Sequence, residues 1–290
     1  MLFFIKIHFL PFEMHNSASF MTLDDFELGK YLGSGQFGQV WLAKHKKSGY
    51  VVALKLLEKE KIKSPFCARQ LRREIEVHSK LKHANILRLH GYFHDKLRIY
   101  LVLEYAAGGE LFEILQKARR FNEQTAAKYI LQVCKAIKYL QVNGVIHRDI
   151  KPENILLGSD DCIKIADFGA AVKNVDKKRY TMCGTKEYLA PEMWEKQNHS
   201  IYLDMWCIGI LTYEFLTGNT PFGSDLTDNE CKSRVNDLKY TFPAYLSFEA
   251  KDFIGKLLKK EPEKRLKIDE VPQHSWIVKN VDESERISFS

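Results

Sequence analysis

The stretch His147-Arg-Asp-Ile-Lys-Pro-Glu-Asn154 places an imidazole, a guanidinium, two carboxylates, an ammonium and an amide within eight residues. A loop that only connects two elements rarely needs so many ionisable groups, whereas a loop that moves a phosphoryl group does. In that interpretation Asp149 accepts the proton of an attacking hydroxyl and Lys151 steadies the transferring phosphate. The alternative is a solvated turn, which one short motif does not exclude.

The bulk composition is that of an ordinary globular protein. The chain has 290 residues, of which 45% are hydrophobic and 28% charged, and its net charge is +7. This length exceeds what one small core needs and predicts two lobes or domains. The basic excess is mild, and no dense block of lysine and arginine with interleaved aromatic residues occurs, so we expect no direct nucleic-acid binding. No apolar run is long enough to predict a membrane span.

The cysteines and the first residues bear on the compartment. Six cysteines are scattered without a C-x-x-C pair, which is typical of reduced thiols in the cytosol or nucleus. The apolar stretch Met1–Leu10 could pass for a secretory signal. However, Lys6 interrupts it, and the following Pro11–Met14 offers no small-residue cleavage site. We therefore interpret residues 1–23 as an N-terminal extension.

A glycine-rich stretch, Gly33-Ser-Gly-Gln-Phe-Gly38, lies between the strand-like segments Phe26–Leu32 and Val40–Ala43. G-x-G-x-x-G alone is weak evidence, because a dinucleotide-binding oxidoreductase carries the same pattern. That fingerprint opens a helix and needs an acidic residue on a second parallel strand. Here the flanking residues predict a hairpin, followed by a strand over Tyr50–Leu57. Such a hairpin can lay its backbone N–H groups over ATP phosphates.

Lys55 lies within the third predicted strand, where its ammonium can reach the α- and β-phosphates of ATP. A strand lysine is usually only an exposed charge, so a partner is needed to make it informative. A helix predicted over residues 66–81 carries Glu74. An ion pair between Lys55 and Glu74 would orient the lysine and couple ATP binding to the position of the helix.

Two further strands are predicted near Leu87–Phe93 and Ile99–Leu103, and the segment Glu104–Gly109 then breaks the strand pattern. We interpret this break as a hinge between lobes. Backbone groups of Glu104 and Ala106 would hydrogen-bond adenine, and Leu103 would wall the pocket behind it.

Beyond the hinge the pattern becomes mostly helical. Asn122 is a predicted N-cap for a long helix that ends near Gln141. The segment Leu203–Leu216 is apolar nearly all round, which predicts a helix in the middle of a core, so Asp204 needs a buried partner. Smaller helices are expected near residues 225–236, 247–259 and 268–279, and we expect the polar segment 282–290 to fray.

The remaining motifs follow in order. Asp167-Phe-Gly169 comes after a strand at Cys162–Ala166, and its carboxylate would chelate magnesium. Ala190-Pro-Glu192 closes the segment, and Arg265 is the expected buried partner of Glu192.

With these motifs in place, the chain resembles the eukaryotic protein kinases from Phe26 to Ile277, and H-R-D-x-x-x-x-N is their catalytic-loop signature. Lys151 and Thr185 resemble the serine/threonine branch. The chain is most similar to the Aurora kinases, and that similarity lies in Gln70–Glu76, Asn85–Asp95, Val145–Gly158 and Arg179–Thr185. It departs from the Aurora pattern at Ala170-Ala171, where Trp-Ser is usual, and at Leu189-Ala-Pro, where Leu-Pro-Pro is usual.

The resemblance implies an α+β, two-lobed kinase fold: a small lobe with an antiparallel sheet and one helix, and a larger, mainly helical lobe. The expected boundaries are 1–23 for the extension, 24–106 for the small lobe and hinge, 107–279 for the large lobe and 280–290 for a tail. The implied cofactors are ATP and Mg²⁺, with Asn154 and Asp167 as metal ligands and Asp149, Lys151, Asn154, Lys55 and Glu74 as catalytic residues. The implied ATP-binding residues are Leu32, Gly33, Ser34, Gly35, Gln36, Phe37, Gly38, Gln39, Val40, Ala53, Lys55, Leu103, Glu104, Ala106, Glu153, Asn154 and Asp167.

The resemblance also implies a mitotic role in cytoplasm and nucleus, at spindle, centrosome or chromosomes. Another spindle-associated serine/threonine kinase, for example a polo-like one, stays open. A pseudokinase scaffold is a different class of function. It is disfavoured because Lys55, Glu74, Asp149, Asn154 and Asp167 are all present.

Regulation and specificity follow from the same comparison. Thr181 matches the activating phosphosite, Arg148 could pair with its phosphate, and Arg179 at its −2 position suits self-phosphorylation in trans. The alternative is a solvated loop with an unmodified threonine. Thr185 is expected to bond Asp149 or Lys151 near the substrate. Glu110 and Glu153 are placed to read arginine at −2 or −3 of a protein substrate.

His78 lies one turn beyond Glu74, where many kinases have an apolar residue that stacks with Phe168. Two interpretations remain open. The helix could be intrinsically loose and require an activator peptide on the small lobe, or His78 could be a core histidine with its hydrogen bonds satisfied.

Overall fold

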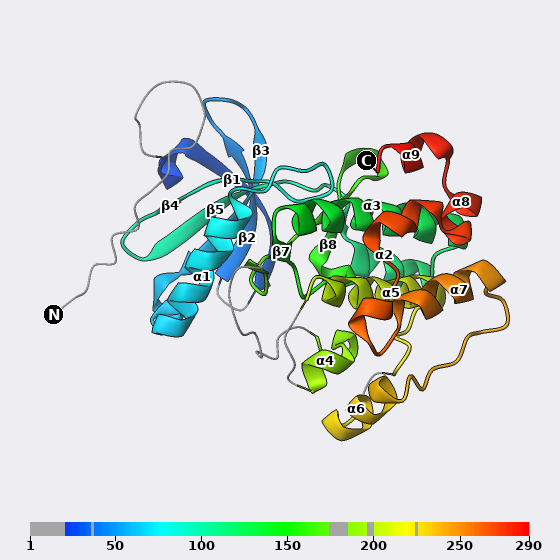
Figure 1. Cartoon of the computed structure of the whole chain (residues 1–290). Coiled ribbons are helices and arrows are strands. Elements are labelled where there is room, and N and C mark those ends of the chain that lie inside the picture. Colours follow the sequence, from blue (N-terminus) through cyan, green and yellow to red (C-terminus); the bar gives the residue numbers. More distant parts are fainter. Residues whose placement is uncertain (1–20, 36–37, 174–184, 196–199, 224–225, 290) are drawn as a thin grey trace. The chain divides into compact units, whose positions relative to one another are not determined.

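The computed structural model describes residues 21–35, 38–173, 185–195, 200–223 and 226–289 (Figure 1). The chain divides into two compact units. The first comprises the residues up to Ala68 together with Arg88–Tyr105, and the second comprises Arg69–Leu87 together with the residues from Ala106 onward. Most of the helix that the sequence assigned to the small lobe is therefore grouped with the second unit.

The first unit is built on a five-stranded antiparallel sheet in the order β1-β2-β3-β5-β4. Its strands are β1 (Phe26–Gly35), β2 (Gly38–His45), β3 (Val51–Glu58), β4 (Leu89–His94) and β5 (Arg98–Glu104). One face is covered by an aromatic stack, because the ring centroids of Phe93 lie 5.7 Å from Phe26 and 4.6 Å from Tyr100. The pairing of Gly35 with Gly38 confirms the predicted hairpin and excludes the helix that a dinucleotide fingerprint would open.

The second unit is mainly helical. Its longer helices are α2 (Leu111–Ala118), α3 (Glu123–Val142), α5 (Tyr202–Thr217), α6 (Asp228–Asn236) and α7 (Phe248–Leu257). The shorter ones are α4 (Pro191–Trp194), α8 (Ser275–Asn280) and α9 (Glu283–Ile287). Helix α1 (Pro65–His78) begins in the first unit and ends in the second. Strand β6 (Gly109–Glu110) directly precedes α2. Four more short strands follow α3 and precede α4: β7 (Val145–Ile146), β8 (Ile155–Leu157), β9 (Ile163–Ile165) and β10 (Val172–Lys173).

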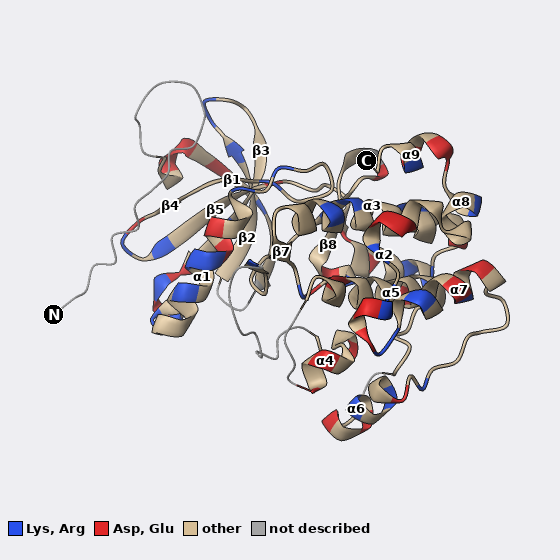
Figure 2. Cartoon of the chain, viewed as in Figure 1, with Lys and Arg blue, Asp and Glu red and all other residues tan. Residues whose placement is uncertain are grey.

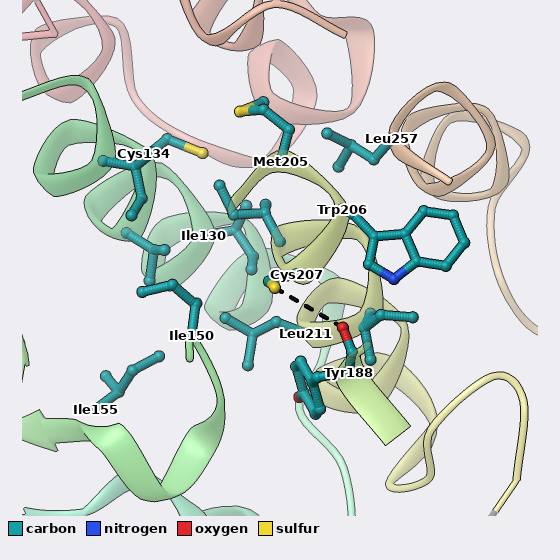
Figure 3. Packing of buried hydrophobic residues seen from close by; sticks show 14 of the residues in the cluster. Ile130, Cys134, Ile150, Ile155, Tyr188, Met205, Trp206, Cys207, Leu211 and Leu257 are labelled. Carbon is teal, nitrogen blue, oxygen red and sulfur yellow. Dashed lines mark hydrogen bonds between the residues drawn. The ribbon is translucent and has the colours of Figure 1, made fainter. Parts of the chain in front are cut away.

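Helix α5 is the centre of this unit's core (Figure 3). Its side chains are buried on nearly every face, as the nearly all-round apolar pattern predicted. At Gly209 a Cβ atom would lie 2.7 Å from a side-chain carbon of Leu258, so the glycine permits close packing on the segment after α7. Gly218 ends the helix in the left-handed conformation, with φ at 79°. Each fully buried Ile or Leu in such a core contributes roughly 1.5–3 kcal/mol.

Helix α3 packs beside α5 and begins where the sequence predicted. The Asn122 side chain accepts a hydrogen bond from the Thr125 backbone N–H at 2.7 Å, which satisfies one of the otherwise unpaired N–H groups at the helix start. Within the described part of the chain, no helix combines the length and apolar character that crossing a membrane requires.

The segment after Val281 was expected to fray, and that expectation is wrong for residues 282–289. They form helix α9 and end on Phe289, which is only 6% exposed and belongs to the core cluster. A single aromatic side chain therefore anchors an otherwise polar segment, a contact that composition alone does not reveal.

Candidate active site

The Asp149 carboxylate is held from several sides. Its Oδ2 accepts a hydrogen bond from Asn154 Nδ2 at 2.8 Å, and its Oδ1 accepts one from the Thr185 backbone N–H at 3.3 Å. Lys151 Nζ lies 3.6 Å from Oδ2 and donates to Thr185 Oγ1 at 2.5 Å. The Asp149 and Lys151 side chains are 17% and 18% exposed, so both still reach solvent. These contacts confirm the expected bonding of Thr185 and give Asp149 one defined orientation.

A buried carboxylate fixes the backbone before Asp149. The two oxygens of Asp204 accept hydrogen bonds from the N–H groups of His147 at 3.0 Å and Arg148 at 2.9 Å. Arg148 has φ at 69°, in the left-handed region that non-glycine residues rarely adopt. Burial raises the pKa of Asp204, and the charge of His147 and the two N–H donors oppose that shift. The partner that Asp204 was expected to need is therefore the strained loop itself.

The segment after β9 carries the second predicted metal ligand. Asp167 has φ at 58°, and its Oδ1 accepts a hydrogen bond from the Gly169 N–H at 3.0 Å. The Ala166 N–H donates to the Asn154 carbonyl at 2.8 Å, so the two predicted metal ligands lie on hydrogen-bonded segments. Phe168 is fully buried, and its ring lies 5.0 Å from that of His147.

The part of α1 that belongs to the second unit packs on the segment Asp167–Gly169. Gln70 Nε2 donates to the Gly169 carbonyl at 3.0 Å, and a Cβ atom built on Gly169 would lie 3.6 Å from Glu74 Oε2. His78 is 4% exposed, and its Nε2 lies 2.6 Å from the Leu87 carbonyl oxygen. Its ring centroid is 4.6 Å from that of Phe168. The structure thus supports the interpretation of His78 as a satisfied core histidine that also stacks on Phe168.

Most of the predicted phosphate- and adenine-binding residues lie in the first unit. Lys55 stands in the middle of β3, paired with Val40 on β2 and Leu101 on β5. At Gly38 a Cβ atom would lie 1.6 Å from the Leu56 carbonyl oxygen, so only glycine lets β2 approach β3 there. The same sheet also carries most of the other predicted ATP-binding residues of this unit: Leu32, Gly33, Ser34, Gly35, Gln39, Ala53, Leu103 and Glu104. Glu74 belongs to the second unit, and its pairing with Lys55 stays a prediction.

Several acidic side chains lie near the catalytic loop, and their charges interact. Burial, followed by the charges of Glu113 and Glu153, raises the pKa of Glu110. The pKa of Glu214 on α5 is raised to about 7, mainly by burial and in addition by the charges of Glu153 and Glu187. The Tyr188 hydroxyl donates a hydrogen bond to Glu214 Oε2, which works in the opposite direction. We call Glu110, Glu153, Glu187 and Glu214 the acidic cluster.

Glu214 was missed at the sequence level. The signal was present, because it is an acid inside the apolar stretch Leu203–Leu216. The same reasoning was applied there to Asp204 alone.

Glu192 and Arg265 form the predicted buried pair. Arg265 Nη1 and Nη2 donate to the two carboxylate oxygens at 2.7 and 2.6 Å, and the side chains are 0% and 2% exposed. The guanidinium also donates to the backbone carbonyls of Tyr202 and Lys259 and lies over the Trp206 ring. This pair ties the start of α4 to the segment that follows α7.

The donor set at the loop fits a hard cation. Asn154 directs Nδ2 to the carbonyl and the carboxylate of Asp149, at 2.9 and 2.8 Å, and so presents its amide oxygen elsewhere. Among the described residues no group of three His, Cys, Asp or Glu side chains could hold a metal by itself. Protein sites commonly bind Mg²⁺ through one or two carboxylates together with substrate phosphates, and Asp167 is the carboxylate predicted here.

Some predicted positions lie outside the described residues. They are Gln36 and Phe37 of the glycine-rich stretch, and Arg179 and Thr181.

The antiparallel sheet, the helical unit and the loop built around Asp149 together define a protein kinase. The protein kinase domain family matches residues 26–277.

The chain belongs to the Aurora kinases. It is 53% identical over 265 residues to an Aurora kinase of Encephalitozoon cuniculi, an alignment that covers 91% of this chain and 97% of that one. It is 50% identical over 258 residues to Aurora kinase A-B of Xenopus laevis, covering 89% of this chain and 63% of that one. It is 48% identical over 264 residues to serine/threonine-protein kinase Aurora-1 of Arabidopsis thaliana, covering 91% and 90%. The chain is therefore a protein serine/threonine kinase that uses ATP, and the departures at Ala170-Ala171 and Leu189-Ala-Pro do not remove it from the family.

Proposed function

We propose that this kinase transfers the γ-phosphoryl group of Mg²⁺-bound ATP to serine or threonine hydroxyls of proteins that carry arginine at −2 or −3. The observation that carries the catalytic part is the geometry of Asp149. Its carboxylate is oriented by Asn154 and Thr185, and the Lys151 ammonium lies beside it. Orientation of this kind supplies much of the rate enhancement in phosphoryl transfer, because the reaction is slow mainly for want of positioning and charge stabilisation.

In the proposed mechanism Asp149 accepts the proton of the substrate hydroxyl as that oxygen attacks the γ-phosphorus. Lys151 stabilises negative charge on the transferring group, and Thr185 holds Lys151 and Asp149 in register. Bound Mg²⁺ would be held by Asn154 and Asp167 and would neutralise charge on the phosphates. Lys55, oriented by Glu74, would position the α- and β-phosphates under the glycine-rich turn, and the backbone of Glu104 and Ala106 would bind adenine.

The acidic cluster supports the arginine preference. The charge of Glu153 adds to the burial that raises the pKa of Glu110 and of Glu214, and a site short of positive charge is complementary to a substrate guanidinium. Glu110 and Glu153 are the residues that the sequence indicated, and Glu214 extends the cluster into α5. A guanidinium bound among them would be recognised by shape and charge together.

The regulatory part of the proposal concerns Thr181 and an activator. Arg148 donates from Nε to the Ala170 carbonyl at 2.7 Å, which holds its guanidinium close to the segment after Phe168. A phosphate on Thr181 would pair with that guanidinium. We keep an activator peptide on the first unit as part of the proposal. A role in mitosis at spindle, centrosome or chromosomes follows from membership of the Aurora kinases, and imaging of a tagged protein through the cell cycle tests it.

A peptide assay tests the chemistry. The full chain should phosphorylate a serine peptide with arginine at −2 and −3, and Asp149→Asn should lower kcat by about 10³-fold or more, because the base is lost while the loop geometry is kept. Glu263→Gln, a change at an exposed position outside the acidic cluster, is the matched control and should keep full activity. Activity retained by Asp149→Asn would contradict the mechanism, and equal rates on a peptide without arginine would contradict the specificity.

A further inference from the structure

The spacing of arginine and hydroxyl residues selects two positions in this chain. Of all the serines and threonines in the 290 residues, only Thr181 and Ser288 have arginine at −2, and none has arginine at −3. The arginines concerned are Arg179 and Arg286. The chain therefore contains two matches to the substrate pattern proposed above, and Ser288 lies outside the segment from Asp167 to Glu192 that holds Thr181.

Ser288 is described by the structure. It follows α9 and is exposed, and its Oγ accepts a hydrogen bond from Lys135 Nζ on α3 at 2.7 Å. The same hydroxyl donates to the Glu285 carbonyl at 2.9 Å. Lys138, one turn further along α3, donates to the Phe289 carbonyl at 3.3 Å and lies over its ring. The serine hydroxyl thus contacts one ammonium group, and a second ammonium group contacts the next residue along the chain.

The surroundings of these lysines favour an added anion. Lys135 is half-buried, and burial lowers its pKa because its charge is incompletely solvated; the charges of Glu285 and Cys162 offset this only in part. Lys138 pairs with the exposed Asp269 at 3.1 Å. Lys128, on the same helix, pairs with Asp161 at 2.9 Å. Lys138 and Lys128 thus each pair with a carboxylate, whereas Lys135 donates its hydrogen bond to a neutral hydroxyl.

We propose that Ser288 is a phosphorylation site on which a second copy of this kinase acts, and that the phosphate fastens α9 to α3 through Lys135 and Lys138. The inference rests on the arginine preference of the proposed function. In the reaction Ser288 Oγ forms a bond to the γ-phosphorus of ATP while the bond from that phosphorus to the β–γ bridging oxygen breaks. ADP leaves, and the hydroxyl proton passes to Asp149 of the acting copy.

The docked segment has to open before it can react. Arg286 Nε donates to the Val281 carbonyl at 3.2 Å, and residues 283–287 are helical, so the arginine and serine are not extended as a kinase substrate needs. A helix of only five residues, docked through Phe289 and two lysine hydrogen bonds, opens readily. After transfer, a dianionic phosphate would replace the hydroxyl beside Lys135, which exchanges a neutral hydrogen bond for a charge-assisted one.

The first experiment asks whether the site is used. Phosphatase-treated Asp149→Asn chain is the substrate, wild-type chain in catalytic amount is the enzyme, and the sites are mapped by mass spectrometry after incubation with Mg²⁺ and ATP. Phosphate should appear on Ser288 and Thr181. Arg286→Ala in the substrate chain should lower Ser288 labelling about tenfold and leave Thr181 unchanged, because only one arginine contact is lost. Ser284, on the same helix but without arginine at −2, is the internal control and should stay unmodified.

The outcomes separate the two hypotheses. Phosphate on Thr181 and on a basic peptide, with none on Ser288, would overturn this inference alone. Absence of phosphate from the peptide and from both residues would overturn the proposed function as well.

A second experiment tests the receptor. Hydrogen exchange of the α9 amides should slow about tenfold on phosphorylation of Ser288, because a charge-assisted hydrogen bond replaces a neutral one. Lys135→Met should abolish that slowing, whereas Lys117→Met, at an exposed position of α2, should keep it. Equal or faster exchange in the phosphorylated wild-type chain would contradict the fastening role.

Discussion

Glu192 and Glu214 are two glutamates of the same unit, both largely withdrawn from water, and their surroundings are opposite. Glu192 meets the Arg265 guanidinium through two hydrogen bonds of 2.7 and 2.6 Å. Glu214 accepts a hydrogen bond from the neutral Tyr188 hydroxyl. Burial, reinforced by the charges of Glu153 and Glu187, raises its pKa to about 7, although the Tyr188 hydrogen bond opposes the shift. One carboxylate is compensated from within the chain, and the other is left short of positive charge.

The opposite surroundings of Glu192 and Glu214 indicate that the two carboxyls have different roles. A compensated buried charge contributes to the fold, because removing either partner leaves the other uncompensated. A carboxyl short of positive charge costs stability in the unbound protein and gains a partner when a guanidinium arrives. Substitutions in the acidic cluster are therefore expected to weaken function but to raise stability. Substitutions in the Glu192–Arg265 pair should mainly lower stability.

The largest expected effect is on the compensated pair. Arg265→Leu leaves the Glu192 carboxylate buried without its partner and should lower the free energy of unfolding by about 3–5 kcal/mol, measured by denaturant titration. The double variant Glu192→Leu/Arg265→Leu removes both charges and should recover part of that loss. A loss below about 1 kcal/mol for Arg265→Leu would show that the pair is not a main tie of α4.

The next effect should fall on substrate selection. Glu214→Gln removes a charge but keeps an acceptor for Tyr188, and it should lower kcat/KM for a peptide with arginine at −2 by about 10- to 100-fold. A matched peptide with alanine at that position should change less than about twofold. If both peptides lost activity equally, Glu214 would act on the fold of the site and not on arginine.

The same substitution should have the opposite effect on stability. Glu214 titrates at about 7 in the folded chain, against 4.5 for the ordinary glutamate. Because its folded-state pKa is raised, its contribution is fully present below pH 4.5 and is lost as the pH rises through about 7. The free energy of unfolding of Glu214→Gln should therefore match that of the wild type at low pH, near 4.5, and exceed it by about 2 kcal/mol at pH 8. This figure is the free energy that corresponds to a pKa rise from 4.5 to about 7, reduced because the side chain is partly solvated. Denaturant titrations at both pH values measure this, and a variant less stable at pH 8 would contradict it.

Sequence reasoning reached the compensated pair and the loop, but only part of the acidic cluster. Glu192 and Arg265 are 73 positions apart, and their predicted pairing is confirmed although only Glu192 stands in a motif, Ala190-Pro-Glu192. The loop around Asp149 was likewise predicted from the spacing of its own residues. Asp204 was expected to need a partner, because a carboxylate in an apolar helix is costly. Which N–H groups would serve depends on where the chain places His147, 57 positions away, and no local pattern shows that.

Glu214 and Phe289 show the limit more clearly. The pKa of Glu214 is raised mainly by burial and also by Glu153 on another segment, so the shift exists only in the folded chain. Phe289 appears in sequence as one aromatic in a polar run, and only its packing near Lys138 reveals an anchor. Local periodicity predicts elements well, whereas charge coupling and single anchors depend on tertiary contacts.

The smallest expected effect measures how far the Tyr188 hydroxyl lowers the pKa of Glu214. Its hydroxyl donates to the carboxylate and thereby lowers the pKa that burial raises. Tyr188→Phe should move the pH midpoint of KM for the arginine peptide upward by about half a unit, which corresponds to roughly 0.5–1 kcal/mol for one hydrogen bond to an ionisable group. Tyr213→Phe is the matched control, because Tyr213 precedes Glu214 on α5 but donates to the Thr241 carbonyl, and it should leave the midpoint unchanged. A downward shift in Tyr188→Phe would mean that the hydroxyl stabilises the protonated carboxyl, and Glu214 would then select arginine only at alkaline pH.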